Sequence, residues 1–311
     1  MSSRHREDKM CRLHATRRCP GLSIINANMN DSNSLEFGKR EPTFSPLFAV
    51  PDGATFPYIT TGAGWQTECF GKRIYYYDVV ASTQDIARSL SLEGTPEGTL
   101  VIAETQTSGR GRKGREWVSH PGGGIYCSVI LRPSVPPAQA AQIPLAAGVA
   151  LARAIRAISG MEATIKWPND IIIKDKKVAG IISEMRCEGD RVDFAVTGFG
   201  VNIGVPIPIL DAGTGGIGTS LEAEADKSIS RTALLRRIAE ELEKAYFKFA
   251  AGGFGAIRGD WKDLTNTLGK KVRIRETGIE GIALDIDEAG SLVIRQDSGE
   301  KSRVSCGEIS F

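Results

Sequence analysis

The sequence predicts an α+β protein: a main domain that combines strands with helices, followed by a small β-barrel or sandwich. Strand-like runs and helix-like apolar periods alternate irregularly over residues 71–263. After Leu264 the chain changes to short strands joined by glycine-bearing turns, a pattern typical of a small all-β unit. We therefore expect three segments: a poorly ordered extension over 1–70, a main domain over 71–263 and a small β-domain over 264–311.

The bulk composition is that of an ordinary globular protein. Of 311 residues, 41% are hydrophobic and 24% charged, and this length suggests two domains or one domain plus appendages. The 39 basic and 37 acidic residues nearly cancel, so the whole chain lacks the charge signature of a nucleic-acid-binding protein. Without a signal-peptide core or an apolar run of about 20 residues, we expect no membrane contact and a cytoplasmic location. Six cysteines without a CxxC pair suit a reducing compartment.

Residues 1–70 differ from the rest of the chain. They begin with an Arg- and His-rich stretch and continue with many Asn, Ser, Pro and Gly residues, without a helical period or clean alternation. This composition favours a poorly ordered extension. Cys11, His14 and Cys19 lie close together, but their spacing fits no standard zinc pattern, so we expect no metal site.

The main domain begins with a strand at residues 73–80, rich in β-branched and aromatic side chains. Ser82 then occupies a helix N-cap position, with Asp85 in the first turn. The further predicted strands are 100–104, 125–131, 164–174, 178–185 and 192–201. Apolar residues at helical spacing predict helices over 139–158 and 231–250. The β-domain contains predicted strands at 271–275, 282–287, 292–296 and 302–306.

The densest chemical signal is the loop that runs from Glu104 to Trp117. Its glycines formally satisfy GxGxxG, but no helical pattern follows Gly114 and the motif alone is weak evidence, so we reject a dinucleotide fold. Four cations lie within six residues of this loop, namely Arg110, Arg112, Lys113 and Arg115. They repel one another, so we expect a loop that stays mobile until an anion binds. Because arginine binds phosphate bidentately and Trp117 offers a face for a base, the loop favours a phosphorylated ligand, with RNA as the alternative.

The second signal is Ile165-Lys-Trp-Pro-Asn-Asp170, which joins two strand segments. Apolar neighbours suggest that Lys166 is partly buried, and a buried cation usually has an anionic partner. That partner is either a structural carboxylate such as Asp170 or a ligand's carboxylate or α-phosphate. The motif alone supports both equally, and the nearby basic loop favours the ligand.

Several segments, taken together and in order, resemble the biotin–protein ligase family, in the form without an N-terminal helix-turn-helix domain. The segments that carry the resemblance are Asp78–Asp85, Gln106 with Gly109–Arg115, Lys166–Asp170, Lys177–Glu184, Gly198–Gly204 and Gly218–Leu221. The resemblance covers about residues 73–311. It implies a mixed-sheet catalytic domain of the biotin/lipoate ligase type with helices packed on it, and an SH3-like C-terminal barrel.

The resemblance also implies an activity and a set of contacts. The chain would convert biotin and ATP, with Mg²⁺ accompanying the ATP, to biotinyl-AMP, and would then biotinylate a lysine of a biotin carboxyl carrier domain, such as that of acetyl-CoA carboxylase. A homodimer is compatible with it. The implied biotin contacts are Ser82, Thr83, Gln84, Gln106, Arg110, Gly111, Arg112, Lys166 and Gly180. The implied ATP or adenylate contacts are Arg110, Arg112, Arg115, Trp117, Lys166, Asn169, Lys177 and Asn202. Lys166, Arg110 and Arg112 would carry the catalysis, and Gln84 departs from the family's more familiar Asn.

Three other functions remain as alternatives. A lipoate or octanoyl transfer enzyme shares the scaffold, although the Arg-rich loop favours biotin. A biotin-responsive repressor would need an N-terminal helix-turn-helix, and residues 1–70 show no pair of periodic helices, so we expect no specific DNA binding. An RNA-binding module would not explain the Lys166 segment.

Overall fold

The computed structural model describes three stretches of the chain, residues 58–60, 64–214 and 218–311. Most of the predicted extension lies outside these stretches, and so do the N-terminal cysteines and histidine considered above as a metal site. Residues 64–70, at the end of that extension, pack on the main domain. There the Glu243 carboxylate accepts the backbone N–H groups of three consecutive residues at 2.7, 2.7 and 2.9 Å.

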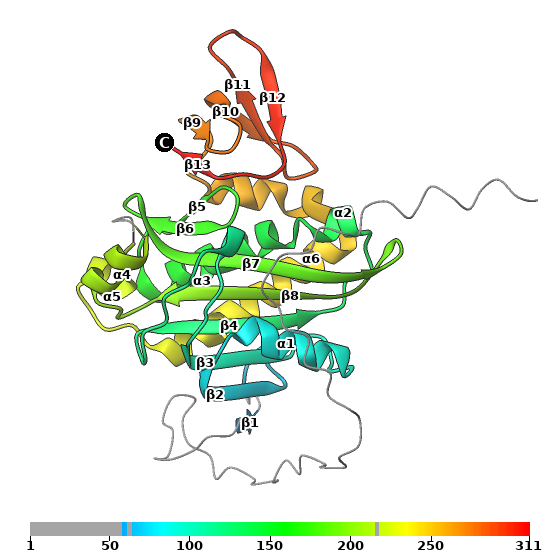
Figure 1. Ribbon diagram of the computed structural model, residues 1–311, viewed down its shortest axis with the longest axis vertical. Coiled ribbons are helices and arrows are strands. Elements are labelled where there is room, and N and C mark those ends of the chain that lie inside the picture. The colour runs from blue at the N-terminus through cyan, green and yellow to red at the C-terminus, as the bar shows by residue number, and fades with distance from the viewer. Residues whose placement is uncertain (1–57, 61–63, 215–217) are drawn as a thin grey trace, which may run out of the picture. The chain divides into compact units, whose positions relative to one another are not determined.

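An eight-stranded mixed sheet forms the main domain (Figure 1). Its strands, in the order in which they lie side by side, are β1 (Tyr58–Thr60), β2 (Ile74–Val80), β3 (Leu100–Gln106), β4 (Gly124–Leu131), β8 (Arg191–Asn202), β7 (Lys176–Glu188), β6 (Asp170–Ile173) and β5 (Thr164–Lys166). β2 and β3 run parallel, and the other neighbours are antiparallel. The run predicted as one strand over 164–174 is divided into β5 and β6, which pair as a hairpin around the turn that contains Pro168.

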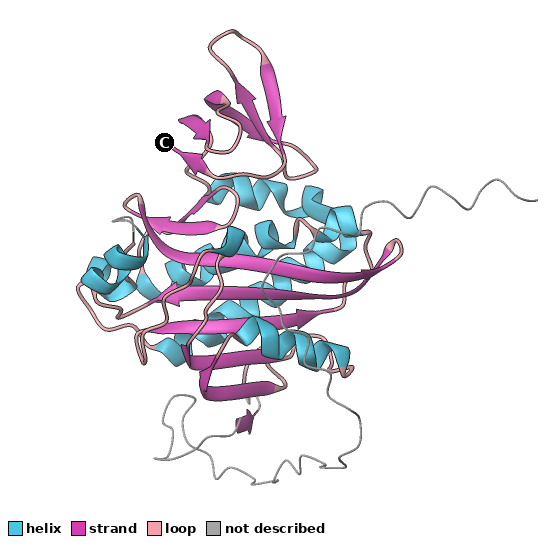
Figure 2. Cartoon of the chain, in the orientation of Figure 1, coloured by secondary structure: helices cyan, strands magenta, loops and turns pink. Residues whose placement is uncertain are grey.

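Helices cover both faces of this sheet (Figure 2). α1 (Thr83–Leu92) begins directly after Ser82, as predicted, and packs on β3, β4 and β8. α3 (Ile143–Ser159) and α6 (Arg231–Leu264) pack along each other on the opposite face. Side chains alternate along a strand, so Leu100 and Ile102 join the large core with α3 and α6, whereas Val101 joins the small core under α1.

One helical segment among the described residues, Pro137–Ser159, is long and apolar enough by length and composition to cross a membrane. The sequence alone does not predict such a segment. The segment comprises α2 (Pro137–Ala140) and α3, and 61% of its most apolar stretch is buried inside the protein. Leu145, Val149 and Ile155 belong to the main core, so α3 is a core helix that packs on the sheet and on α6.

α6 is longer than the helix predicted over 231–250. The backbone leaves helical geometry at Gly252 (φ −142°) and Gly253 (φ 65°), and the helix then resumes and runs to Leu264. The continuation buries three large side chains, Phe254, Ile257 and Trp261. The glycine pair therefore kinks the helix without ending it. The helix resumes because the residues beyond the pair still have an apolar face to bury.

The C-terminal part is a five-stranded antiparallel sheet, hereafter the barrel. Its strands, in spatial order, are β12 (Lys301–Val304), β11 (Leu292–Arg295), β10 (Glu280–Ile286), β9 (Lys271–Ile274) and β13 (Ile309–Ser310). Trp167, in the turn between β5 and β6, bonds to the barrel: its backbone N–H donates to Thr267 Oγ1 at 3.0 Å and its indole N–H to Gly290 O at 3.2 Å. A mixed sheet with helices and a small β-domain confirms the predicted fold class.

Several short elements were not predicted. They are β1, β13, α4 (Ile207–Thr214) and α5 (Leu221–Ala225). None is longer than eight residues, which is too short to display a clear apolar period.

Candidate active site

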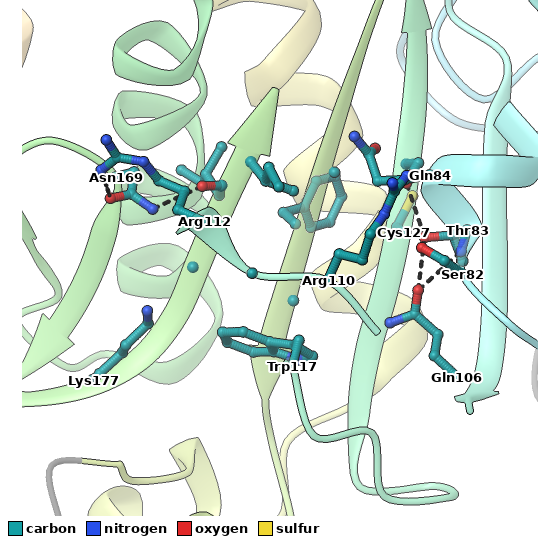
Figure 3. A pocket seen from close by; sticks show the side chains of 18 residues that line it. Ser82, Thr83, Gln84, Gln106, Arg110, Arg112, Trp117, Cys127, Asn169 and Lys177 are labelled. Carbon is teal, nitrogen blue, oxygen red and sulfur yellow. Dashed lines mark hydrogen bonds between the residues drawn. The ribbon is translucent and has the colours of Figure 1, made fainter. Parts of the chain in front are cut away.

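A pocket lies where β4, β7 and β8 pass the start of α1 and the basic glycine loop (Figure 3). All the residues expected to contact biotin line it, with the exception of Lys166. Residues that were not predicted complete the lining, among them Cys127 and Ser128 of β4, Ile181 of β7 and Phe199 of β8. The fold thus brings together segments that are far apart in the sequence.

The α1 end of the pocket is densely hydrogen-bonded through neutral side chains, and the Arg110–Asp85 ion pair lies beside it. Gln106 Oε1 accepts the Thr83 backbone N–H at 2.9 Å and the Thr83 hydroxyl at 3.2 Å, and Gln106 Nε2 donates to Ser119 Oγ at 3.2 Å. Thr83 Oγ1 also lies 2.8 Å from Ser128 Oγ. Thr83 and Ser128 are buried, so these bonds are shielded from water and hold the side chains in place. Such an end can recognise a polar, neutral group.

Two buried oxygen atoms at this end, Ser82 Oγ and Gln84 Oε1, have no hydrogen-bond partner within the described chain. Ser82 occupies the N-cap position of α1, yet its hydroxyl makes no capping bond. Gln84 Nε2 donates to Val196 O at 3.3 Å, and a Cβ at Gly198 would lie 2.7 Å from Gln84 Oε1. Buried polar atoms are normally paired, so these two oxygens identify places for a ligand's polar atoms.

Trp117 forms one wall of the pocket and packs on the backbone of β7 and β8. A Cβ at Gly180 would lie 2.8 Å from Trp117 Cζ3, and one at Gly200 would meet the indole more closely still. Glycine at these positions therefore lets the ring approach the sheet. The indole Nε1 is buried without a partner in the described chain, and Lys177 Nζ lies 5.5 Å from the ring centroid.

The basic glycine loop folds back as a small hairpin. The Gly111 N–H donates to Arg115 O at 2.7 Å, and the Trp117 N–H donates to Gly109 O at 2.8 Å. A single 3-10 turn (Arg112–Gly114) forms its tip, and no α-helix follows. The absence of a helix after the loop agrees with the rejection of a dinucleotide fold, and the hairpin turns Trp117 back toward the sheet.

Two cations at the pocket have carboxylate partners in the main domain. Arg110 Nη2 lies 2.7 Å from Asp85 Oδ1 and 3.3 Å from Glu184 Oε2. Lys177 Nζ lies 2.7 Å from Asp170 Oδ1. Both cations are therefore held in place by charge before any ligand binds.

Two further loop cations pair with the barrel. Lys113 forms an ion pair with Glu276, and Arg115 forms one with Glu308. These two carboxylates offset the mutual repulsion of the loop cations. The sequence alone predicts a self-repelling, mobile loop and does not indicate these partners. The ion pairs place the barrel directly against the loop.

Arg112 differs from its neighbours because its hydrogen-bond partner is neutral. Its Nη1 donates to Asn169 Oδ1 at 2.7 Å, and Asn169 Nδ2 donates to Ile181 O at 2.8 Å. Burial lowers the pKa of Arg112 from its usual value, while the charge of Asp170 acts in the opposite direction. Arginine nevertheless stays protonated, so its other N–H groups are available to an anion.

A second pocket adjoins the first and shares Arg112 and Trp117 with it. It contains the residues expected at the nucleotide except Arg110 and Lys166, namely Arg112, Arg115, Trp117, Asn169, Lys177 and Asn202. Asn202 Nδ2 donates to Thr219 O at 3.1 Å, and its buried Oδ1 has no partner among the described residues. That oxygen can accept an N–H group of a ligand.

Lys166 ends β5 and lines neither pocket. Its ammonium group lies 4.9 Å from the centroid of the Phe311 ring, which belongs to the barrel. Burial lowers the pKa of Lys166. Asp170, the structural partner considered from the sequence, forms its ion pair with Lys177. Lys166 therefore lies at the junction of the sheet and the barrel.

Sequence reasoning missed Ser119 and Ser128 at the neutral end and the barrel residues at the charged end. Ser128 had a usable signal, because it is a single polar residue inside the apolar run of β4. The barrel contacts Glu276, Glu308 and Phe311 had none, since each meets a residue more than one hundred positions away.

Comparisons with known proteins match both parts of the chain. The family model described as Biotin/lipoate A/B protein ligase family matches residues 76–202, and the one described as Biotin protein ligase C terminal domain matches residues 267–311. The bifunctional ligase/repressor BirA of Bacillus spizizenii is 38% identical over 240 residues, which cover 76% of this chain and 74% of that protein. The biotin–[acetyl-CoA-carboxylase] ligase of Paracoccus denitrificans is 34% identical over 227 residues, which cover 70% and 92%.

Solved structures of biotin protein ligases also resemble this chain. A biotin protein ligase from Aquifex aeolicus, in complex with biotin and ATP, has a TM-score of 0.64 and 28% sequence identity to this chain. The alignment covers 76% of this chain and 97% of that one. The likeness therefore includes nearly the whole of a structure that holds both small molecules.

Proposed function

Because this chain belongs to the biotin protein ligase family and is a ligase, we propose that it activates biotin with ATP to biotinyl-5′-AMP and transfers biotin to a lysine of a biotin carboxyl carrier domain. The relatives named biotin–[acetyl-CoA-carboxylase] ligase support an acceptor of that kind. A cytoplasmic location fits such an acceptor.

The observation that carries this proposal is the pair of adjoining pockets with different chemistry. One pocket ends in neutral hydrogen-bonding groups, the other is lined by cations, and Arg112 and Trp117 belong to both. Biotin is likewise neutral at its ureido ring and anionic at its carboxylate. We propose that the ureido ring binds at the α1 end, with its carboxylate toward Arg112 and the nucleotide pocket.

The neutral end favours biotin over lipoate. Ser82 Oγ and Gln84 Oε1 are buried without partners in the described chain, and Thr83, Gln106 and Ser128 add hydroxyl and amide groups. A ureido ring offers two N–H donors and a carbonyl acceptor for such groups. An apolar dithiolane or acyl chain would leave them unpaired, which costs binding energy.

In the first half-reaction a biotin carboxylate oxygen attacks the α-phosphorus of ATP, and the bond from that phosphorus to the pyrophosphate oxygen breaks. Negative charge develops around the α-phosphate. We propose that Arg112 and Lys166 stabilise it, with Arg110 and Gly111 holding the biotin chain, since prearranged cations act strongly in a site shielded from water. Trp117 and Asn202 would hold the adenine, and Arg115, Asn169 and Lys177 the remainder of the nucleotide.

In the second half-reaction the acceptor lysine's neutral amine attacks the carbonyl carbon of the mixed anhydride. The carbonyl–oxygen bond to AMP breaks, AMP leaves as an anion, and the amine loses a proton. Neither half forms a covalent bond to the enzyme, so positioning and charge stabilisation supply the catalysis. Mg²⁺ enters as part of the ATP substrate, held by phosphates and water.

The test is biotin-dependent ATP–pyrophosphate exchange, followed by transfer of biotin to a purified carrier domain. We expect exchange with biotin, little with lipoate, and labelling of a carrier domain that is lost when its acceptor lysine becomes arginine. Exchange driven by lipoate, or no exchange with either acid, would contradict the proposal.

The repressor activity of the Bacillus relative, which is named a bifunctional ligase/repressor, is a separate question. The residues preceding position 58 lie outside the described part of the chain. We propose a ligase without specific DNA binding, and a gel-shift assay with biotin-operon operator DNA and biotinyl-AMP tests this directly.

A further inference from the structure

The cations around the two pockets fall into two groups. Those with a carboxylate within ion-pair distance are Arg110, Lys113, Arg115 and Lys177. Lys166 belongs to the other group, because its ammonium group has neither an ion pair nor a hydrogen bond within the described chain. The group that contacts it is the aromatic ring of Phe311.

Two ammonium groups lie over the Phe311 ring in cation–π contacts. Lys166 Nζ lies 4.9 Å and Lys270 Nζ 4.3 Å from its centroid. The ring directly follows β13, which pairs with β9 through Ile309 and Ile274, and Glu308 is tied to the basic loop by its ion pair with Arg115. The barrel therefore anchors the ring beside the end of β5.

We propose that Phe311 is a positioning residue for Lys166 in biotin adenylation, acting as an aromatic platform that holds the ammonium group in its charged form without neutralising it. The inference rests on the role proposed above for Lys166. It adds a residue of the barrel to the machinery of the main domain.

The ring suits this task better than a carboxylate would. An aromatic face attracts a cation through its quadrupole but carries no net charge, so the cation remains free to attract an incoming carboxylate or phosphate. A carboxylate would satisfy the ammonium group and compete with the substrate. Lys177 illustrates this second arrangement, because its ammonium group already pairs with the Asp170 carboxylate at 2.7 Å.

The surrounding charges explain why the platform matters. Burial is the largest influence and lowers the pKa of Lys166. Asp170 of β6 raises that pKa, whereas Lys177 of β7, Lys270 before β9 and Arg275 after β9 lower it. The Phe311 ring, like the Asp170 carboxylate, favours the charged form of Lys166.

Removal of the ring should move the pKa of Lys166 further down. Since the charged lysine is the active form, the basic limb of the adenylation pH profile should shift to lower pH by about half a unit, as expected for one cation–π contact. The rate near neutral pH should fall about fivefold because the ammonium group is also less well placed.

The experiment compares full-length variants in biotin-dependent ATP–pyrophosphate exchange as a function of pH. Phe311→Leu removes the ring and keeps apolar bulk, Phe311→Tyr keeps the ring, and Phe311→Glu replaces it with a competing carboxylate. Phe247→Leu is the matched control, because Phe247 is 39% and Phe311 49% exposed and the Phe247 ring packs against the rings of Phe70 and Tyr246. Thermal unfolding verifies that each variant is folded.

We expect the Leu variant to be about fivefold slower with a shifted basic limb, the Glu variant slower still, and the Tyr and Phe247 variants close to the parent. An unchanged Leu variant, a faster one, or a Tyr variant as slow as the Leu variant overturns the proposal. Absence of exchange in the parent protein would instead refute the proposed function, so the two failures are distinguishable.

A second readout does not need activity. Acetic anhydride labels neutral amines, and mass spectrometry can compare Lys166 with the exposed Lys227 in each variant. Relative labelling of Lys166 should rise about threefold in the Leu variant and stay unchanged in the Tyr variant. Equal labelling in the parent and the Leu variant overturns the platform.

Discussion

The two ends of the site are built in opposite ways. At the α1 end, Thr83, Gln106 and Ser128 form a buried network of neutral hydrogen bonds within the main domain. At the charged end, cations of the loop and of β5 meet groups of the barrel, such as Glu308 and Phe311. One end is built from α1 and the main sheet, and the other combines groups of the main domain and of the barrel.

We propose that this difference separates recognition of biotin from the chemistry of its activation. Neutral hydrogen bonds discriminate by shape and are insensitive to salt, whereas partly exposed ion pairs weaken as ionic strength rises. We therefore expect substitutions at the charged end to change the rate of adenylation, and substitutions at the neutral end to change the affinity for biotin.

The largest effect should follow Lys166→Ala. Loss of a cation at the developing phosphate charge should lower the rate of biotin-dependent pyrophosphate exchange about 10²–10³-fold, with little change in thermal unfolding because the side chain is only partly buried. Near-normal exchange by this variant would remove Lys166 from the chemistry and break the contrast between the two ends.

Arg112→Ala should have the next largest effect. Arg112 contributes to both pockets, and loss of charged hydrogen bonds should weaken retention of biotinyl-AMP by about 10–100-fold. Release of the intermediate can be followed by gel filtration after a single turnover with radiolabelled ATP. Retention equal to that of the parent would count against the role of Arg112 as a bridge.

Ser128→Ala should have a smaller effect of a different kind. Removal of the hydroxyl that meets Thr83 should raise the Michaelis constant for biotin about fivefold and leave that for ATP unchanged. Ser183→Ala is the control, because Ser183 Oγ pairs with Thr197 Oγ1 at 3.0 Å in the same sheet and lines neither pocket. A rise in the ATP constant would show that the two ends are not separate.

Local sequence predicted most of the larger elements and failed where structure depends on distant partners. The dense β-branched and aromatic run at Ile74–Val80 and the apolar period after Arg231 are strong local signals. The predicted helix ended at residue 250, whereas the structure continues it beyond Gly252 and Gly253 to Leu264. A local pattern does not show that this continuation has a core to cover. The parallel pairing of β2 with β3 is also long-range; the family resemblance implied a mixed sheet but did not specify this pairing.

The same limit applies to the site. Glycines and cations in the loop around Arg110 mark anion chemistry within a few residues, so the pocket wall could be predicted. The partners of those cations could not, because Glu276 and Glu308 are separated from the loop by most of the chain. The position of Lys166 outside both pockets could not be predicted either, because Lys166 lies against the barrel residue Phe311, far away in the sequence.

The packing of Trp117 on Gly180 and Gly200 has an optical consequence. Of the four tryptophans in the chain, Trp65, Trp167 and Trp261 are buried, whereas Trp117 is partly exposed and forms the wall shared by the two pockets. Indole emission changes in colour and intensity with the polarity around the ring. The protein therefore carries a built-in fluorescent reporter at the place where the two substrates would meet, and their arrival can be timed without attaching a dye.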